Sequence, residues 1–225
     1  MKSFNIILLI TLYSSSSLAD TSSTVSVVSD YLFNGVSQTN EKPALQVSLD
    51  WAADNGLYVG VWGSNVKFGE GTNLEADGYL GYYTAISDNI HIDIGAAQYT
   101  YSGASFSSDY NYAEAWTKFS FGNTGVNFWY AWDYFGTGAG HVIAMLTQSF
   151  PISDNLSILT GVDISSSLDA DKWSWEANDK DYIHWQVTAQ YHFKGFDFAL
   201  GVEGTDLDTY GDTTILLTAA KTFEF

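Results

Sequence analysis

Hydrophobic and polar residues alternate along most of the chain with a period of two. The pattern is clearest from Ile183 to Phe193, where apolar residues occupy one face and His, Gln and Thr the other. This is the period of a β-strand with one apolar and one polar face. It predicts twelve strands, each end accurate to about two to four residues, at 24–38, 43–53, 56–66, 73–86, 89–101, 111–121, 124–135, 140–150, 154–165, 181–193, 196–204 and 213–225.

The connections between these strands alternate in length. Five are tight and rich in the Asp, Asn and Gly that hairpin turns need, namely Asp54-Asn55, Ser87-Asp88, Gly122-Asn123, Pro151–Ser153 and Lys194-Gly195. The other six are generally longer: Asn40–Lys42, Lys67–Thr72, Ser102–Tyr110, Gly136–Ala139, Ser166–Lys180 and Thr205–Asp212. Short turns at one end and longer loops at the other are typical of an outer-membrane β-barrel, with both chain ends on the short-turn side.

The last segment, Thr213–Phe225, has one mostly apolar face and ends on a phenylalanine. We expect it to close the barrel by pairing with the first strand, so that no strand edge faces lipid. Lys221 lies on the apolar face, which requires its ammonium to reach the membrane interface. The alternative is an edge strand of a soluble β-sandwich.

The N-terminus has the organisation of a secretory signal peptide. Met1-Lys2 precedes an apolar run from Phe4 to Tyr13, and Ser17-Leu18-Ala19 follows as a small-residue cleavage site. The run is too short to span a bilayer as a helix. We therefore expect residues 1–19 to be removed and residues 20–225 to form one all-β domain, a single antiparallel up-and-down transmembrane β-barrel of about 12 strands.

Composition supports a barrel and excludes one class of partner. The chain has no cysteine, two prolines and 16% aromatic residues, which suits uninterrupted strands bounded by aromatic girdles. Its formal net charge is −18 and it contains no arginine, whereas phosphate binding needs a basic surface. A nucleic-acid role is thereby excluded. Part of the acidic surplus is explained simply by solvated loops.

Three blocks carry a family resemblance. They are SDYLFNGVSQTNEKPALQ at Ser29–Gln46, GLYVGVWGSNV at Gly56–Val66 and LEADGYLGYY at Leu74–Tyr83. They resemble the TorF-like porins of proteobacteria, also called Gcw_chp proteins. The resemblance implies an outer-membrane porin, and the family's namesake is associated with trimethylamine N-oxide respiration. A basic residue is usual between Phe33 and Gly35, but Asn34 stands there in this chain, which argues against an anion-binding role at that point.

The polar faces of the predicted strands would line the lumen. The expected pore-lining residues are Asp30, Asn34, Asp50, Tyr58, Trp62, Glu75, Asp77, Tyr79, Asp93, Glu114, Lys118, Trp129, Asp133, Asp163, His184, Gln186, Gln190, Asp197 and Glu203. Carboxylates outnumber basic residues in this set, and acidic rings favour cations in a pore. The sequence therefore predicts a narrow, cation-preferring diffusion channel. Alternatively, the carboxylates pair with Lys118 and the histidines or lie near the rims.

Aromatic residues also fall on the inward faces, among them Tyr58, Trp62, Tyr79, Tyr83 and Trp129. Rings beside carboxylates could hold a small quaternary amine or N-oxide through cation–π contacts and ion pairing. The simpler interpretation is that they pack together and stabilise the lumen.

Two other functions compete with a porin. A hydrolase would need a nucleophile and base near one rim, and His141 and His184 with Asp133 and Asp181 are the available candidates. No serine has a recognisable nucleophile context and no metal-ligand spacing occurs, so we expect no enzyme, metal or cofactor. A closed structural or adhesive barrel is the second alternative. The loop Ser166–Lys180, with Trp173 and Trp175, would then cover the mouth, bind a partner or meet lipid headgroups.

The expected location is the outer membrane of a Gram-negative bacterium. The expected partners are the lipid bilayer, lipopolysaccharide, small polar solutes, and the barrel-assembly machinery acting on the C-terminal strand.

Overall fold

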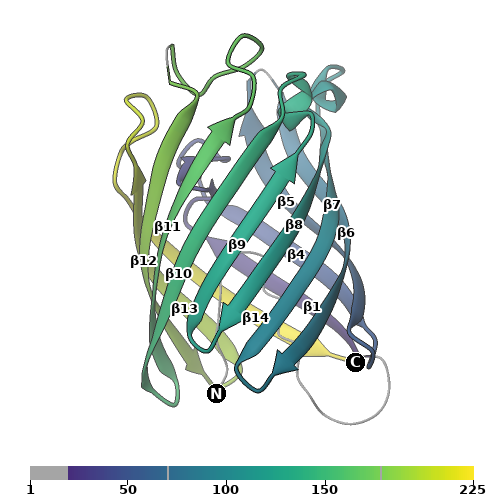
Figure 1. Cartoon of the computed structure of the whole chain (residues 1–225), viewed down its shortest axis with the longest axis vertical. Helices are drawn as coiled ribbons and strands as arrows, with labels where there is room; N and C mark the ends of the chain where they lie inside the picture. The colour runs from purple at the N-terminus through teal and green to yellow at the C-terminus, as the bar shows by residue number, and fades with distance from the viewer. Residues whose placement is uncertain (1–19, 70, 178) are drawn as a thin grey trace.

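The structure, a computed structural model, describes residues 20–69, 71–177 and 179–225. The predicted signal peptide lies outside these residues. Twelve long antiparallel strands form a closed barrel (Figure 1). They are β1 (Asp20–Val28), β4 (Ala44–Ala52), β5 (Leu57–Phe68), β6 (Thr72–Ser87), β7 (Ile90–Ser102), β8 (Tyr112–Phe121), β9 (Thr124–Ala131), β10 (His141–Ser153), β11 (Leu156–Ser167), β12 (Asp181–Phe193), β13 (Phe196–Thr205) and β14 (Thr214–Glu224).

Each strand pairs with its sequence neighbour, as the up-and-down prediction requires, and β1 closes the ring by pairing with β14. The closing register places Thr24 opposite Thr222, and their hydroxyl oxygens are 2.9 Å apart. The expected pairing of the last strand with the first is therefore confirmed. Among the described residues, no helix is long and apolar enough to cross a membrane.

The outer surface is apolar and the inner surface carries the polar residues. On β4, for example, Leu45, Val47, Leu49 and Trp51 are 42–55% exposed, while the intervening side chains are turned inward. Aromatic residues gather at the short-turn end of the outer surface: Trp51, Phe121, Phe150, Phe193, Phe196 and Phe223. A continuous apolar belt with an aromatic girdle suits contact with lipid.

Lys221 lies on this outer face near the same girdle. Its Nζ is 4.9 Å from the ring centroid of Phe196 and 5.2 Å from that of Phe223. Cation–π contacts of this kind suit an ammonium at the membrane interface, which resolves the conflict between a lysine and an apolar face.

The alternation of short turns and longer loops is confirmed. The short turns and the C-terminus lie at one end of the barrel and the longer loops at the other (Figure 1). The predicted turn at Pro151–Ser153 is displaced, because β10 continues to Ser153 through a register irregularity at Pro151 and the turn falls at Asp154-Asn155. β7 keeps its register with both neighbours at Gly95–Ala97, although three small residues interrupt the alternation of its sequence there.

The first predicted strand, 24–38, is wrong in its second half. β1 ends at Val28, and the chain then forms a two-stranded hairpin of β2 (Leu32–Phe33) and β3 (Val36–Ser37). Asn34 and Gly35 have φ angles of 47° and 81° at its tip, the left-handed conformations that a tight hairpin turn requires. The hairpin lies inside the barrel, near the loop end (Figure 1).

Candidate functional site

The barrel interior has two chemically different walls. Strands β5–β9 present tyrosine, tryptophan and carboxylate side chains inward. The wall from β10 through β14 to β1 and β4 presents mostly hydroxyl and amide groups, such as Thr147, Ser149, Thr188 and Gln190, which are 5–7% exposed. The lumen is thus aromatic and acidic on one side and neutral and polar on much of the other.

Three rings on the aromatic wall lie over glycines of the neighbouring strand. Tyr79 covers Gly60, Tyr58 covers Gly81 and Trp116 covers Gly95, and a Cβ at any of these glycines would fall 2.4 Å from the ring. Because the glycines have no side chain, the rings can lie against the wall instead of across the lumen.

The polar atoms of these rings bind carboxylates. The Tyr58 hydroxyl donates to Asp93 Oδ1 at 2.6 Å, and Trp116 Nε1–H donates to the same oxygen at 2.8 Å. The Tyr79 hydroxyl donates to Asp50 Oδ1. Two of the predicted inward carboxylates are therefore held against the wall by aromatic donors.

Gly95→Val is expected to lower the free energy of unfolding by about 1–3 kcal/mol, as overpacking does. The new Cβ would meet the Trp116 ring at 2.4 Å and the Leu80 carbonyl oxygen at 2.6 Å, and a backbone oxygen cannot move away cheaply. Gly78→Val is the matched control, since nothing lies within 4 Å of its Cβ position. Urea unfolding in lipid vesicles measures both variants, and equal losses would contradict the packing argument.

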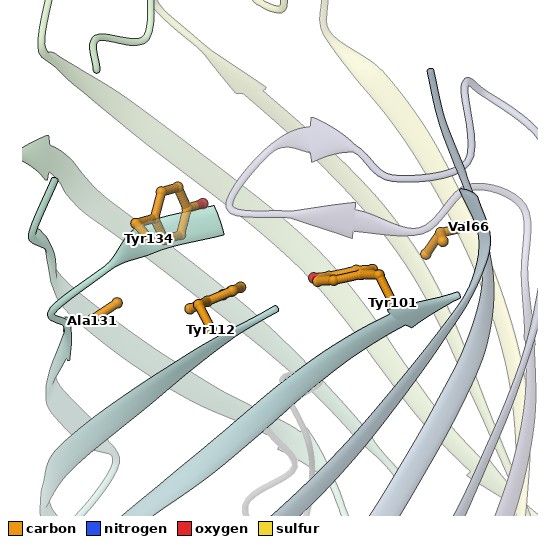
Figure 2. Close-up of a cluster of buried hydrophobic side chains, with 5 residues drawn as sticks. All are labelled: Val66, Tyr101, Tyr112, Ala131 and Tyr134. Atoms are coloured by element: carbon orange, nitrogen blue, oxygen red, sulfur yellow. The ribbon is translucent and has the colours of Figure 1, made fainter. Parts of the chain in front are cut away.

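An aromatic cluster occupies the loop end of the lumen. We use "upper cluster" for Val66, Tyr101, Tyr112, Ala131 and Tyr134 (Figure 2). The three tyrosine rings reach into the barrel interior close to the β2–β3 hairpin. Further rings pack against them, including Phe33 of the hairpin, Phe135, Trp173 and Trp175.

The two tryptophans of the Ser166–Lys180 loop pack on the upper cluster at the loop end of the barrel. Trp173 and Trp175 lie 5.2 and 6.0 Å, between ring centroids, from Tyr134. The His141 ring is stacked 4.0 Å from Tyr134 and meets the Trp173 ring edge-on at 5.9 Å. Of the three roles expected for this loop, the contacts favour that of a cover.

This loop is also tied to the β13–β14 connection. Glu176 accepts hydrogen bonds from the backbone N–H groups of Thr209 at 2.6 Å and Asp208 at 3.0 Å. These two donors hold the pKa of Glu176 below its usual range. Protonation would remove the acceptor charge, so the tie is present at neutral pH and is lost only as the pH falls through that lowered value.

A buried charged cluster joins β11, β12 and β13. His184 Nδ1 lies 2.6 Å from Asp163 Oδ2, and His184 Nε2 lies 3.1 Å from Glu203 Oε2. The three residues are 2%, 3% and 9% exposed. An ionised carboxylate can only accept hydrogen bonds, so when both carboxylates are ionised both ring nitrogens must donate, and an imidazolium then lies between them.

The tip of the β2–β3 hairpin rests on this cluster. The Tyr182 hydroxyl donates to the Asn34 carbonyl oxygen at 2.9 Å, and a Cβ at Gly35 would fall 2.5 Å from Thr205 and 2.8 Å from His184. β12 is separated from β1 by β13 and β14. The first connection therefore crosses part of the lumen before it returns to β4.

The hairpin is held at its base by Asp30. Asp30 Oδ1 accepts hydrogen bonds from Ser37 at 2.7 Å and Thr39 at 2.6 Å, while Thr39 Oγ1 also accepts from the Tyr31 N–H. The Gln38 carbonyl oxygen accepts from the Lys67 N–H of β5 at 2.8 Å. These bonds fix the direction in which the hairpin leaves the wall.

The structure places most of the expected pore-lining residues on inward strand faces. Three of them do not lie on barrel strands. Asp30 is at the base of the hairpin, Asn34 is at its tip, and Asp133 follows β9 and accepts a hydrogen bond from the Gly138 N–H. The inward set is Asp50, Tyr58, Trp62, Glu75, Asp77, Tyr79, Asp93, Glu114, Lys118, Trp129, Asp163, His184, Gln186, Gln190, Asp197 and Glu203.

Several inward residues were absent from that expectation. Tyr99 and Tyr101 share a face with Asp93, and Trp116 shares one with Glu114 and Lys118. The small residues Gly95-Ala96-Ala97 interrupt the alternation before the two tyrosines and hid them, whereas the parity of Trp116 was sufficient to find it. Tyr182 shares the inward face of His184 and Gln186, so its parity was also sufficient to find it. Tyr31 lies in the first connection, outside the barrel strands, and its contact with Trp62 could not be predicted from strand parity.

The residues considered for a hydrolase do not converge on an accessible site. His141 Nε2 lies 3.1 Å from Ser165 Oγ, but both residues are 0% exposed and His141 Nδ1 has no partner. Asp181 is bonded to Ser166, and Asp133 to Gly138. In the part of the chain that the structure describes, no three acidic, histidine or cysteine groups are placed to hold a metal ion.

Solved structures with a similar fold include porins. The KdgM porin superposes with a TM-score of 0.56 at 10% identity, covering 92% of this chain and 99% of that one. The same porin in complex with disordered oligogalacturonate gives 0.55 at 9% identity, covering 92% and 99%. The NanC porin gives 0.53 at 11% identity, covering 91% and 98%. At these identities the likeness establishes the fold.

Comparison of the sequence identifies one protein family. No curated protein matches the chain significantly. The family model described as "Bacterial protein of unknown function (Gcw_chp)" matches residues 13–225, nearly the whole sequence, in agreement with the resemblance carried by the three blocks in its first half. The chain therefore belongs to the Gcw_chp family of bacterial proteins.

Proposed function

We propose that this protein is an outer-membrane porin through which small polar solutes diffuse passively, with a preference for cations. The observation that carries the proposal is the charge of the lumen. Eight inward carboxylates lie on the barrel strands: Asp50, Glu75, Asp77, Asp93, Glu114, Asp163, Asp197 and Glu203. Three of them are paired with histidines, Asp163 and Glu203 with His184 and Asp197 with His192, which leaves five on the aromatic wall and β4. Within the described residues, Lys118 is the one lysine on an inward face. A surplus of carboxylates around a pore attracts cations and repels anions.

The porin fold supports this function. The charge of the lumen, however, does not suit a polyanionic solute. The KdgM porin has been solved with oligogalacturonate, an acidic sugar chain. A chain with no arginine and a net charge of −18 offers such a ligand little attraction. We therefore assign cations and neutral solutes to this barrel.

The hydroxyl and amide wall offers the more suitable path for a hydrated solute, since the upper cluster fills much of the opposite side. Small amines and trimethylamine N-oxide are the solutes that the carboxylates and rings suit best. Liposome swelling with trimethylamine N-oxide and with a sugar of similar size would compare them. Faster swelling with the N-oxide supports this preference, and equal rates would remove it.

In planar bilayers with a potassium chloride gradient, the reversal potential should be shifted toward the equilibrium potential of potassium. The effect should be larger at 0.1 M salt than at 1 M, because the screening length falls from about 10 Å to about 3 Å. A reversal potential shifted toward the equilibrium potential of chloride would reject the cation preference. If the purified barrel shows no conductance, the upper cluster closes it and the structural or adhesive alternative replaces the porin.

The proposal includes export through a cleaved signal peptide, insertion beside lipopolysaccharide, and assembly guided by the C-terminal strand. The apolar belt with its aromatic girdle supports insertion into the membrane, and the aromatic residues near the end of β14 support assembly guided by that strand. Recovery of the mature chain, starting near Asp20, in the outer-membrane fraction is the expected result.

A further inference from the structure

The outer face of the barrel is hollowed where β12, β13, β14 and β1 lie side by side. The hollow, which we call the lateral groove, has a volume of about 520 Å³. Ser29 and Pro43, at the two ends of the first connection, line its loop side. The outward side chains that line it are aromatic or aliphatic and include Val27, Tyr191, Phe198, Leu217 and Ala219. The lateral groove is therefore suited to a hydrocarbon chain.

The lateral groove is hollow because a small residue lies between larger ones and because β1 is short. Ala219 is paired in register with Phe198 on one side and with Val27 on the other. β1 ends at Val28, where the chain turns into the lumen, so this strand does not extend the wall further toward the loop end (Figure 1). The hollow therefore follows from the geometry of the sheet, not from the position of an exposed loop.

Four aromatic rings connect the lateral groove with the short turn between β12 and β13. Tyr191 and Phe193 are stacked on β12 with their centroids 6.0 Å apart, and Phe196 and Phe198 are stacked on β13 at 6.2 Å. The register places Tyr191 opposite Phe198 and Phe193 opposite Phe196. The four side chains are 42–47% exposed on the outer face. They form a continuous ring surface from the lateral groove to the aromatic girdle.

Two ammonium groups lie at the lower end of this ring surface. Lys194, in the short turn, has its Nζ 5.1 Å from the centroid of Phe193, and Lys221 lies over Phe196 at 4.9 Å. Among the described residues, neither lysine is in an ion pair. The other four short turns contain no lysine: Asp54-Asn55, Ser87-Asp88, Gly122-Asn123 and Asp154-Asn155. Positive charge at this end of the outer face is therefore concentrated beside the lateral groove.

An apolar groove beside unpaired ammonium groups suits an anionic lipid. The short turns of outer-membrane barrels face the periplasm, and lysines at a membrane interface attract anionic headgroups. We infer that this surface binds one anionic phospholipid of the periplasmic leaflet. Its phosphodiester lies between Lys194 and Lys221, and one acyl chain follows the four rings into the hollow over Ala219. The site is separate from the lumen and goes beyond the proposed porin function.

Native mass spectrometry of the purified barrel tests the site. We expect the barrel to retain dioleoylphosphatidylglycerol about tenfold more tightly than dioleoylphosphatidylcholine, which has the same acyl chains but no net charge. Lys194→Gln/Lys221→Gln should reduce retention of the first lipid to the level of the second. Lys172→Gln/Lys180→Gln is the matched control, because it removes the same charge from exposed lysines of the Ser166–Lys180 loop, and it should bind as the wild type does.

Ala219→Phe tests the lateral groove apart from the lysines. The larger side chain fills the hollow and leaves both charges in place, so it should weaken retention of both lipids by a similar factor while the preference for phosphatidylglycerol remains. Retention of the heat-modifiable, barrel-specific gel mobility shows that each variant is folded.

Four outcomes would overturn the inference. They are equal retention of the two lipids by the wild type, equal loss in the two double variants, unchanged retention in Ala219→Phe, and a protein dimer without lipid that Ala219→Phe dissociates. The last result would show that a second copy of the chain covers the lateral groove. Because mass spectrometry requires no open channel, a barrel that conducts nothing but retains the lipid would refute the porin and keep the site.

Discussion

Removal of the β2–β3 hairpin is expected to raise the single-channel conductance severalfold. Replacing Leu32–Ser37 by two glycines would shorten the first connection while keeping Asp30 and Thr39 at its base. The hairpin crosses the lumen from β1 to Tyr182 on β12, and Phe33 packs against the upper cluster. Its loss therefore opens space beside the hydroxyl and amide wall.

Tyr182→Phe provides a milder version of this experiment. It removes the hydrogen bond to the Asn34 carbonyl oxygen but leaves the hairpin and the ring in place. We expect this variant to open more often to the higher conductance of the hairpin-replaced barrel, while the size of that conductance stays the same. An unchanged conductance after hairpin replacement, in a barrel that retains its heat-modifiable gel mobility, would show that the hairpin does not restrict the pore.

The hairpin was not predicted from the sequence because two local signals conflict there. The apolar residues Tyr31, Leu32 and Phe33, followed by Val36, resemble a continuation of the first strand, whereas Asn34-Gly35 is a strong hairpin signal. The turn signal was correct. Phe33 is apolar because it packs on the upper cluster inside the barrel, not because it meets lipid.

The strand number could be predicted because turn residues and period-two alternation are local properties. Contacts inside the lumen could not, since they depend on the register between strands. Asp163, His184 and Glu203 were each expected to point inward, but only the pairing of Asp163 with His184, and of Gln186 with Glu203, brings the three together. A shift of one residue would turn these side chains outward.

Their convergence leads to the largest stability effect that we expect. His184→Leu should lower the free energy of unfolding by about 3–5 kcal/mol, the usual cost of removing one partner of a buried ion pair. The substitution would leave Asp163 and Glu203 facing each other without a cation. Asp163 Oδ1 already lacks a partner, so no other donor is available nearby.

His192→Leu is the matched control on the same strand. His192 Nδ1 lies 2.8 Å from Asp197 Oδ1, a similar distance, but the His192 side chain is 47% exposed, compared with 2% for His184. Exposed ion pairs contribute about 0–1 kcal/mol, so the control should lose little in urea unfolding from lipid vesicles. If His184→Leu lost only the roughly 0–1 kcal/mol expected of His192→Leu, burial would not strengthen the His184 cluster. The cluster would then be too weak to serve as the platform on which the hairpin tip rests, and its role in positioning the hairpin would have to pass to Tyr182 and Thr205.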